Sequence, residues 1–85
     1  MNPRRLLARL SQGPLQNVSF GDFVRLVESF GFRLARVSGS HQVYAHPAIP
    51  ELINLQDVEG EAKPYQIRQF LRLVERYNLK LEDRS

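Results

Sequence analysis

The chain of 85 residues contains no cysteine, so it can form neither a disulfide framework nor a cysteine-based metal site. Histidine is nearly as scarce: only His41 and His46 are present, without the spacing or the carboxylate cluster of a metal site. We therefore expect no metal and no cofactor. No apolar run reaches the length of a signal sequence or a membrane span, so we expect a cytoplasmic protein with no membrane partner.

A chain of this length holds one small two-layer core, and any functional site must lie on the surface or in a shallow cleft. The net charge is +3. All of this excess lies in the first ten residues, which carry Arg4, Arg5 and Arg9 and no acid. All but two of the twelve cations are arginine, the side chain best suited to bidentate phosphate contacts. This composition favours a nucleic-acid partner, although ordinary salt-bridged surfaces are also rich in arginine.

Two strong amphipathic patterns predict the main helices. The first begins at Ser19, which can cap it, and ends at Gly31; the second begins at Pro64, a favoured first helical residue. Their expected core stripes are Phe20, Phe23, Val24, Val27 and Phe30 in the first helix and Ile67, Phe70, Leu71 and Val74 in the second. A shorter helix is expected over residues 2–10, with Leu6, Leu7 and Leu10 on one side to pack on the domain, another subunit or a partner.

Alternating residues predict three strands, over 32–37, 41–45 and 52–55, with Phe32 and Leu34 on one face of the first. Residues 38–40 form the first turn, and the acidic segment 56–62 is expected to be a surface loop. The order predicts an α+β fold in which two helices cover one face of a three-stranded antiparallel meander and leave the other face open. We expect an N-terminal extension and connector over 1–17, a domain over 18–78 and a fraying tail over 79–85.

The turn before the second strand draws attention to His41. Histidine is the side chain whose ordinary pKa, about 6.5, allows it to exchange protons near neutral pH. A Ser-Gly-Ser turn would present such a side chain to a substrate. The same turn could equally do no more than close a hairpin.

Several short motifs, in order, carry a family resemblance. They are Gly31-Phe32, Gly39-Ser40-His41, His46-Pro47, Lys63-Pro64 and Ile67-Arg68. Between Phe20 and Tyr77 the chain resembles the HicA toxins of bacterial type II toxin–antitoxin systems, also called the YcfA-like family. The segments 53–56 and 62–66 look like the longer branch of that family, which tends to carry an N-terminal helical extension.

The resemblance implies a double-stranded-RNA-binding-like α-β-β-β-α fold, in agreement with the periodicity. It also implies an mRNA endonuclease, or mRNA interferase, whose key residue is His41, and a HicB-like antitoxin that covers the active surface. One position departs from the family: a second histidine commonly follows the first, and Gln42 stands there instead. Because an amide cannot titrate, any acid or base duty of that second imidazole is lost.

RNA can be cut without a metal when its own 2′-hydroxyl attacks the adjacent phosphorus, helped by a base, an acid and cations. We expect His41 to be the base or the acid, and the backbone N–H groups of Gly39 and Ser40 with the Ser40 hydroxyl to hold a phosphate oxygen. Lys63, just before a helix, could bind a neighbouring phosphate, or could be an ordinary exposed lysine.

Two arginines complete the expected site, whereas the second histidine is expected to lie outside it. Arg68 and Arg72 lie on the outer flank of the last helix, where they could bind RNA or simply face solvent. Five extended residues span about 17 Å and an odd separation points to the opposite face, so His41 and His46 cannot share one phosphate. His46 is therefore expected to cap the end of its strand.

Two other classes of function remain open from the sequence. The domain could be an RNA-binding module without chemistry, or an inactive toxin homologue that acts through protein contacts. It could also be a protein-interaction domain that docks through the stripe of Leu6, Leu7 and Leu10. In the favoured interpretation the partners are single-stranded mRNA and the antitoxin, and the free protein is a monomer or a weak homo-oligomer.

Overall fold

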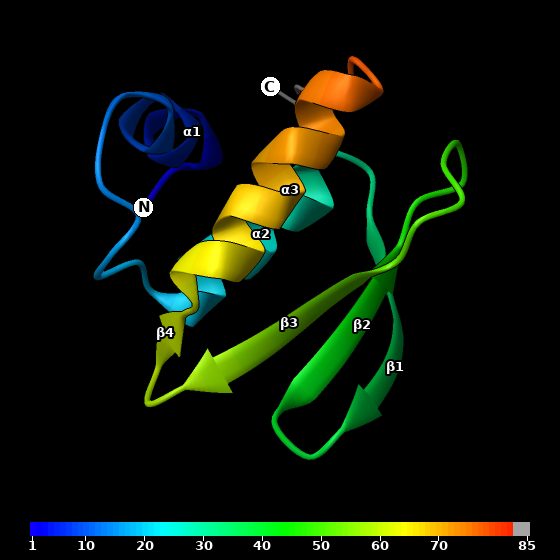
Figure 1. Ribbon diagram of the computed structural model, residues 1–85, viewed down its shortest axis with the longest axis horizontal. Coiled ribbons are helices and arrows are strands. Elements are labelled where there is room, and N and C mark those ends of the chain that lie inside the picture. Colours follow the sequence, from blue (N-terminus) through cyan, green and yellow to red (C-terminus); the bar gives the residue numbers. More distant parts are fainter. Residues whose placement is uncertain (83–85) are drawn as a thin grey trace.

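The computed structural model describes residues 1–82 of the chain (Figure 1). In order, the elements are α1 (Pro3–Gln12), α2 (Phe20–Ser29), β1 (Arg33–Ser38), β2 (His41–Ala45), β3 (Ile53–Val58), β4 (Glu61–Ala62) and α3 (Pro64–Arg76). The strands form one antiparallel sheet in the order β1-β2-β3-β4. Among residues 1–82, no helix is both long enough and apolar enough to cross a membrane.

The two main helices begin where the sequence predicts, and α2 also ends there. Ser19 accepts a hydrogen bond from the Asp22 backbone N–H at 3.3 Å and so caps α2, and Pro64 occupies the first turn of α3. Gly31 follows α2 with φ +98°, a left-handed conformation that glycine adopts at low cost.

The core has an aromatic centre at Phe70 of α3. Its ring meets those of Phe23 and Phe30 edge to face at 5.5 Å, and that of Phe32 at 5.9 Å. Such arrangements add attraction beyond the burial of area. Phe70 therefore joins α2, α3 and the start of β1.

Helix α1 packs against α2 and enlarges this core. Leu6 and Leu10 are buried and Leu7 is half-buried against the same cluster. Asn2 caps the helix by accepting the Arg4 backbone N–H at 2.8 Å. The sequence left three packing modes open for α1, and the structure shows it packed on its own domain. The alternative in which Leu6, Leu7 and Leu10 form a docking surface is wrong, because this stripe is covered.

The sheet has a fourth strand that the sequence analysis missed. The predicted loop over 56–62 instead continues β3 to Val58 and returns as β4. Glu59 and Gly60 both have positive φ, 53° and 85°, which is the pattern of a type I′ hairpin turn. The Gly60 N–H also donates to Asp57 Oδ1 at 2.7 Å. Because the segment is acidic, composition suggested a loop, whereas its Glu-Gly pair closes a hairpin.

Strand β1 forms one outer edge of the sheet, and all six of its residues are exposed. Leu34, expected to share the buried face with Phe32, is 49% exposed. A bulge at Ala35 shifts the register between Leu34 and Arg36. The helices cover β2 and β3 but leave β1 open to solvent.

The predicted tail is partly packed where the structure describes it. Leu79 and Leu81 pack against the core, and the Glu82 N–H donates to the Ser29 carbonyl at 2.7 Å. Residues 83–85 of that predicted tail lie outside the described residues.

Candidate active site

The predicted turn places His41 at the first residue of β2. Ser38 and His41 pair across a two-residue loop in which Gly39 has φ +61°, as in a type II′ turn. A Cβ at Gly39 would meet no atom within 4 Å, so the backbone conformation rather than space selects glycine there. His41 is exposed, and no hydrogen bond or ion pair engages its imidazole among residues 1–82. Its ring is therefore available to a ligand.

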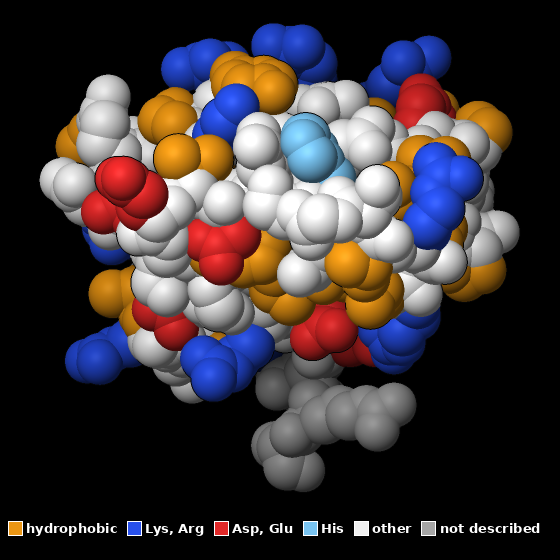
Figure 2. Space-filling model, turned by 90° about the horizontal axis from the view of Figure 1, so that it is seen from below, with side chains coloured by type: hydrophobic (Ala, Val, Ile, Leu, Met, Phe, Trp, Pro, Cys, Tyr) orange, Lys and Arg blue, Asp and Glu red, His pale blue; other side chains and the backbone are white. Residues whose placement is uncertain are grey.

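This turn lies at the lower end of the molecule in Figure 1, below the three helices. Figure 2 shows that end from below: a histidine side chain is at the surface, surrounded mainly by neutral polar and backbone atoms. Lysine and arginine side chains gather towards the margins of this face.

The register of the sheet shows what surrounds His41. Residues directly opposite each other in an antiparallel sheet project to the same face. On the face away from the helices this gives two rows of residues across β1, β2 and β3. The first row is Ser38, His41 and Gln56, and the second row is Arg36, Val43 and Asn54. Neither row contains an acid. Val43 is buried but lies outside the main core cluster, as expected for the opposite face. We call these six residues the open face.

Gln42 lies on the other face, towards the helices. It pairs with Leu55, which is buried in the core, and its Oε1 accepts a hydrogen bond from the Tyr44 hydroxyl at 2.7 Å. Burial raises the pKa of Tyr44, so this hydroxyl stays protonated as the donor at neutral pH. Gln42 therefore points away from His41.

A short hydrogen-bond network ties the turn to α3. The Ser40 carbonyl accepts the Asp57 N–H at 3.2 Å, and the Ser40 hydroxyl accepts the Gln56 amide at 3.4 Å. The Gln56 backbone N–H donates to Gln66 Oε1 at 2.9 Å. Because β4 pairs only with Asp57 and Val58, the ladder ends before Gln56, and the Gln66 side chain supplies the missing acceptor.

The predicted cations lie on α3 and around its start. Lys63 precedes α3, and its Nζ lies 5.6 Å from the centre of the Tyr65 ring. Arg68 and Arg72 are exposed on α3, and neither forms a hydrogen bond or ion pair within residues 1–82. The structure thus links Lys63 to the His41 turn through its neighbours Tyr65, Gln66 and Gln56, but shows no bond from the two arginines to that turn.

His46 has a structural position, in agreement with the prediction that it caps the strand end. Its Nδ1 accepts the Ala48 N–H at 3.0 Å, so Nε2 carries the proton and donates to the Phe30 carbonyl at 3.0 Å. The ring also meets Phe32 edge to face at 5.0 Å. A Cβ at Gly31 would come within 2.9 Å of His46 Nε2, so the close approach and the positive φ both require glycine there.

Sequence reasoning missed Arg36, Gln56 and Gln66. The sequence spacing could have predicted the burial of Gln66. This residue precedes Phe70 by four positions and Leu73 by seven, which places a polar side chain on the core side of the helix. In the structure Gln66 is 4% exposed. For Arg36 the signal was the pairing register of β1, which the bulge at Ala35 conceals. Gln56 was missed because residues 56–62 were expected to be a loop, whereas β3 continues through it and pairs it with His41.

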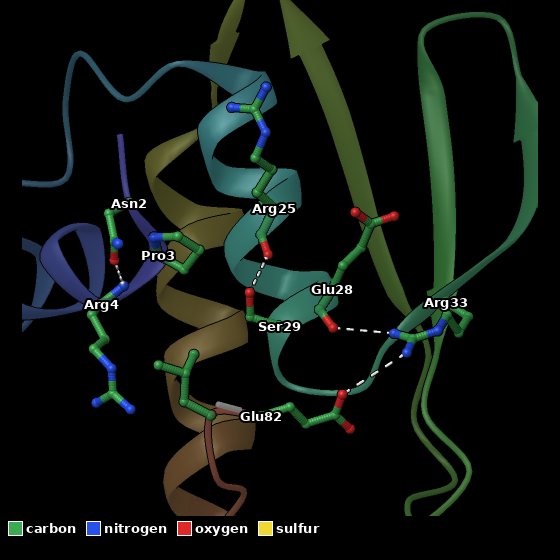
Figure 3. Close-up of a pocket in the computed structure, with 9 residues that line it drawn as sticks. Asn2, Pro3, Arg4, Arg25, Glu28, Ser29, Arg33 and Glu82 are labelled. Carbon is green, nitrogen blue, oxygen red and sulfur yellow. Dashed lines mark hydrogen bonds and ion pairs between the residues drawn. The ribbon is translucent and has the colours of Figure 1, made fainter. Parts of the chain in front are cut away.

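A cavity in the described part of the chain lies away from His41 (Figure 3). It is an open depression of about 630 Å³ between the start of α1, α2 and residues 81–82. Its charged groups have neighbours: Arg33 donates to the Glu28 carbonyl at 3.1 Å and pairs with Glu82 at 3.9 Å. None of the predicted site residues lines it.

From α2 to α3 the element order and the antiparallel sheet define a small α+β domain of the double-stranded-RNA-binding-like class. Residues 20–75 match the family model described as the HicA toxin of bacterial toxin–antitoxin systems, and the chain belongs to this family. Neither the curated proteins nor the solved structures contain a significant match. Members of the family are toxins that generally act as ribonucleases, which implies an RNA target and an antitoxin partner.

Proposed function

We propose that this protein is an mRNA interferase, a metal-independent endoribonuclease in which His41 is the general acid or base. The observation that carries the proposal is the exposed, unengaged imidazole at the Gly39-Ser40 turn, on a sheet face without carboxylates. A phosphodiester lying on the open face meets no like charge there. The family assignment supports an RNA substrate and a cytoplasmic site of action.

The chemistry needs only the RNA and one titrating side chain. The 2′-oxygen loses its proton and bonds to the adjacent phosphorus, and the bond from phosphorus to the 5′-oxygen breaks. The products are a 2′,3′-cyclic phosphate and a 5′-hydroxyl, which receives a proton. In the proposed mechanism His41 either accepts the first proton or donates the second, and water exchanges the other.

Nearby donors can stabilise the charge on the phosphorane. The backbone N–H groups of Gly39 and Ser40 and the Ser40 hydroxyl lie beside His41 and can donate to a phosphate oxygen. We add Arg36, which is in the neighbouring row of the open face and has no ion-pair partner within residues 1–82. Lys63, Arg68 and Arg72 are proposed to hold flanking phosphates, which contribute affinity rather than chemistry.

The direct test is incubation of the purified protein with end-labelled single-stranded RNA in excess EDTA. Shortened products that end in a cyclic phosphate are expected. Binding without shortened products would instead favour a non-catalytic RNA-binding module. If the protein neither bound nor cut the RNA, an RNA function would be refuted. The same RNA with a 2′-deoxy group at the cleaved position should remain intact, because the attacking hydroxyl is absent.

Restoring the family's second histidine by Gln42→His is expected to change the cleavage rate by less than about tenfold. The reason is that position 42 faces the helices and pairs with Leu55, away from the open face. A positioned acid or base would contribute about 10²- to 10⁴-fold. Initial rates of wild type and Gln42→His on one labelled RNA provide the measurement. A gain of a hundredfold or more would contradict this assignment of faces.

The proposed partner of the active surface is a HicB-like antitoxin. A protein that covers the open face would block His41 without altering the fold. We propose that the free toxin is a monomer or a weak homo-oligomer, and sedimentation of the purified protein at several concentrations would test this state.

A further inference from the structure

Tyr65 is a large aromatic residue with no function in the mechanism above. Its side chain is 57% exposed in the first turn of α3. A single exposed aromatic residue is common at a protein surface and does not by itself indicate a function. Here two neighbours hold it: the Gln66 amide donates to the Tyr65 hydroxyl at 3.4 Å, and the Lys63 ammonium lies 5.6 Å from the ring centre.

The same glutamine connects this ring to the part of the sheet that contains His41. Gln66 Oε1 accepts the backbone N–H of Gln56, the residue directly opposite His41. One amide group and two hydrogen bonds thus separate the Tyr65 hydroxyl from the backbone beside His41. Because Gln66 is buried, this link is rigid compared with an exposed side chain.

We infer that Tyr65 is a base-stacking subsite for a nucleotide next to the cleaved phosphate. An aromatic ring offers a stacking surface to any base, and single-stranded RNA is commonly held in this way. Lys63 lies over the same ring and supplies a cation for the phosphate of that nucleotide. Tyr65 would thus bind the base of the nucleotide, and Lys63 would bind its phosphate. The inference rests on the proposed function, because it assumes an RNA strand that passes His41.

RNA explains the pair of residues better than a protein partner does. A protein contact through Tyr65 would not require a lysine ammonium on the ring, whereas a nucleotide presents a π face and a negative charge together. Gln66 in turn acts as a positioning residue, since it holds the ring and the strand opposite His41 but touches no substrate.

The test uses full-length protein with His41→Ala, so that RNA is bound but not cut. Equilibrium binding of a fluorescein-labelled single-stranded RNA is compared for this parent and for the same chain with Tyr65→Phe, Tyr65→Leu or Leu34→Ala. Leu34→Ala is the matched control, because it removes an exposed apolar side chain on β1 outside the open face. Circular dichroism verifies that each variant is folded.

Tyr65→Leu is expected to weaken RNA binding about 10- to 100-fold, as for the loss of one stacked base. Tyr65→Phe keeps the ring and should remain within about threefold of the parent, as should Leu34→Ala. A series of RNAs is also prepared, each with one 2-aminopurine at a different position. For one of these positions the fluorescence should fall when the RNA binds the parent, and should not fall when it binds the Tyr65→Leu variant.

Equal RNA affinity of the parent and Tyr65→Leu would overturn the subsite and leave the proposed function standing; a tyrosine that serves only a protein partner would give this result. Absence of RNA binding by wild type and by the parent would overturn both. The two failures are therefore distinguishable.

Discussion

His41→Ala is expected to lower the rate of RNA cleavage by about 10²- to 10⁴-fold, the usual contribution of one general acid or base. Among the six residues of the open face, His41 alone carries an imidazole and none carries a carboxyl group, so no neighbour can replace it as acid or base. The loss should appear in the single-turnover rate on labelled RNA. In cells that lack an antitoxin, wild type should arrest growth and accelerate mRNA decay, whereas the variant should do neither.

The folded state should not change, because the His41 ring makes no hydrogen bond or ion pair within residues 1–82. Urea denaturation of both proteins is therefore the control, with equal midpoints expected. His46→Ala is the matched comparison. It should lower the midpoint, since His46 bonds to Phe30 and Ala48, while leaving toxicity intact at a temperature at which the variant is folded. Equal toxicity of wild type and His41→Ala would refute the assignment of the acid or base.

Phe70→Ala should reduce the free energy of unfolding by about 3–5 kcal/mol, the range for removing a large buried aromatic side chain. The Phe70 ring is fully buried and meets three other phenylalanines, so a cavity would open where α2, α3 and β1 join. A domain of this size has only about 5–15 kcal/mol in total. The variant should therefore lose a large part of its stability, as measured by urea unfolding followed by circular dichroism.

Arg72→Ala, two residues further along α3, is the matched control because its side chain is exposed and unpaired within residues 1–82. It should change stability by less than about 0.5 kcal/mol. Phe70→Leu should recover part of the loss, since it fills some of the cavity. Similar unfolding midpoints for Phe70→Ala and Arg72→Ala would show that the aromatic centre is not the main support of the fold.

The sequence predicted most of the fold, for local reasons. Ser19, Gly31 and Pro64 mark helix ends through effects that act within a few residues, and the two-residue turn and Pro47 bound β2. Leu26 and Leu73 were missed from the core because the buried side of each helix is wider than one stripe. For α2 the reason is its position: it packs against α1 as well as against the sheet.

The fourth strand depended on a conformation that composition does not reveal. Glu59 adopts positive φ, which is uncommon for a residue with a side chain, and the adjacent Gly60 completes the turn. Besides its hairpin partner β3, β4 bonds to a segment from far along the chain: Ala62 donates to the Val18 carbonyl at 2.9 Å, and Phe20 donates to the Gly60 carbonyl at 2.8 Å. No short stretch of sequence contains that information.

For the candidate site, residue chemistry located His41 and its turn, and the family resemblance supplied a role for them. What could not be predicted was which side chains share its face. The register assigns Arg36 and Gln56 to that face and removes Gln42 from it. Gln66 matters because it accepts the backbone N–H of Gln56, at the point where the β3–β4 ladder ends. The end of that ladder is defined only in the folded chain.

The outer strand β1 has a consequence for handling the protein. Its unpaired backbone groups and exposed Leu34 could template strand pairing between molecules, and the bulge at Ala35 with the charges of Arg33 and Arg36 opposes such aggregation. Neutralising Arg36 to study phosphate binding therefore also removes a safeguard of solubility. Activity of an Arg36→Ala protein should be compared with wild type in dilute samples freshly cleared by gel filtration.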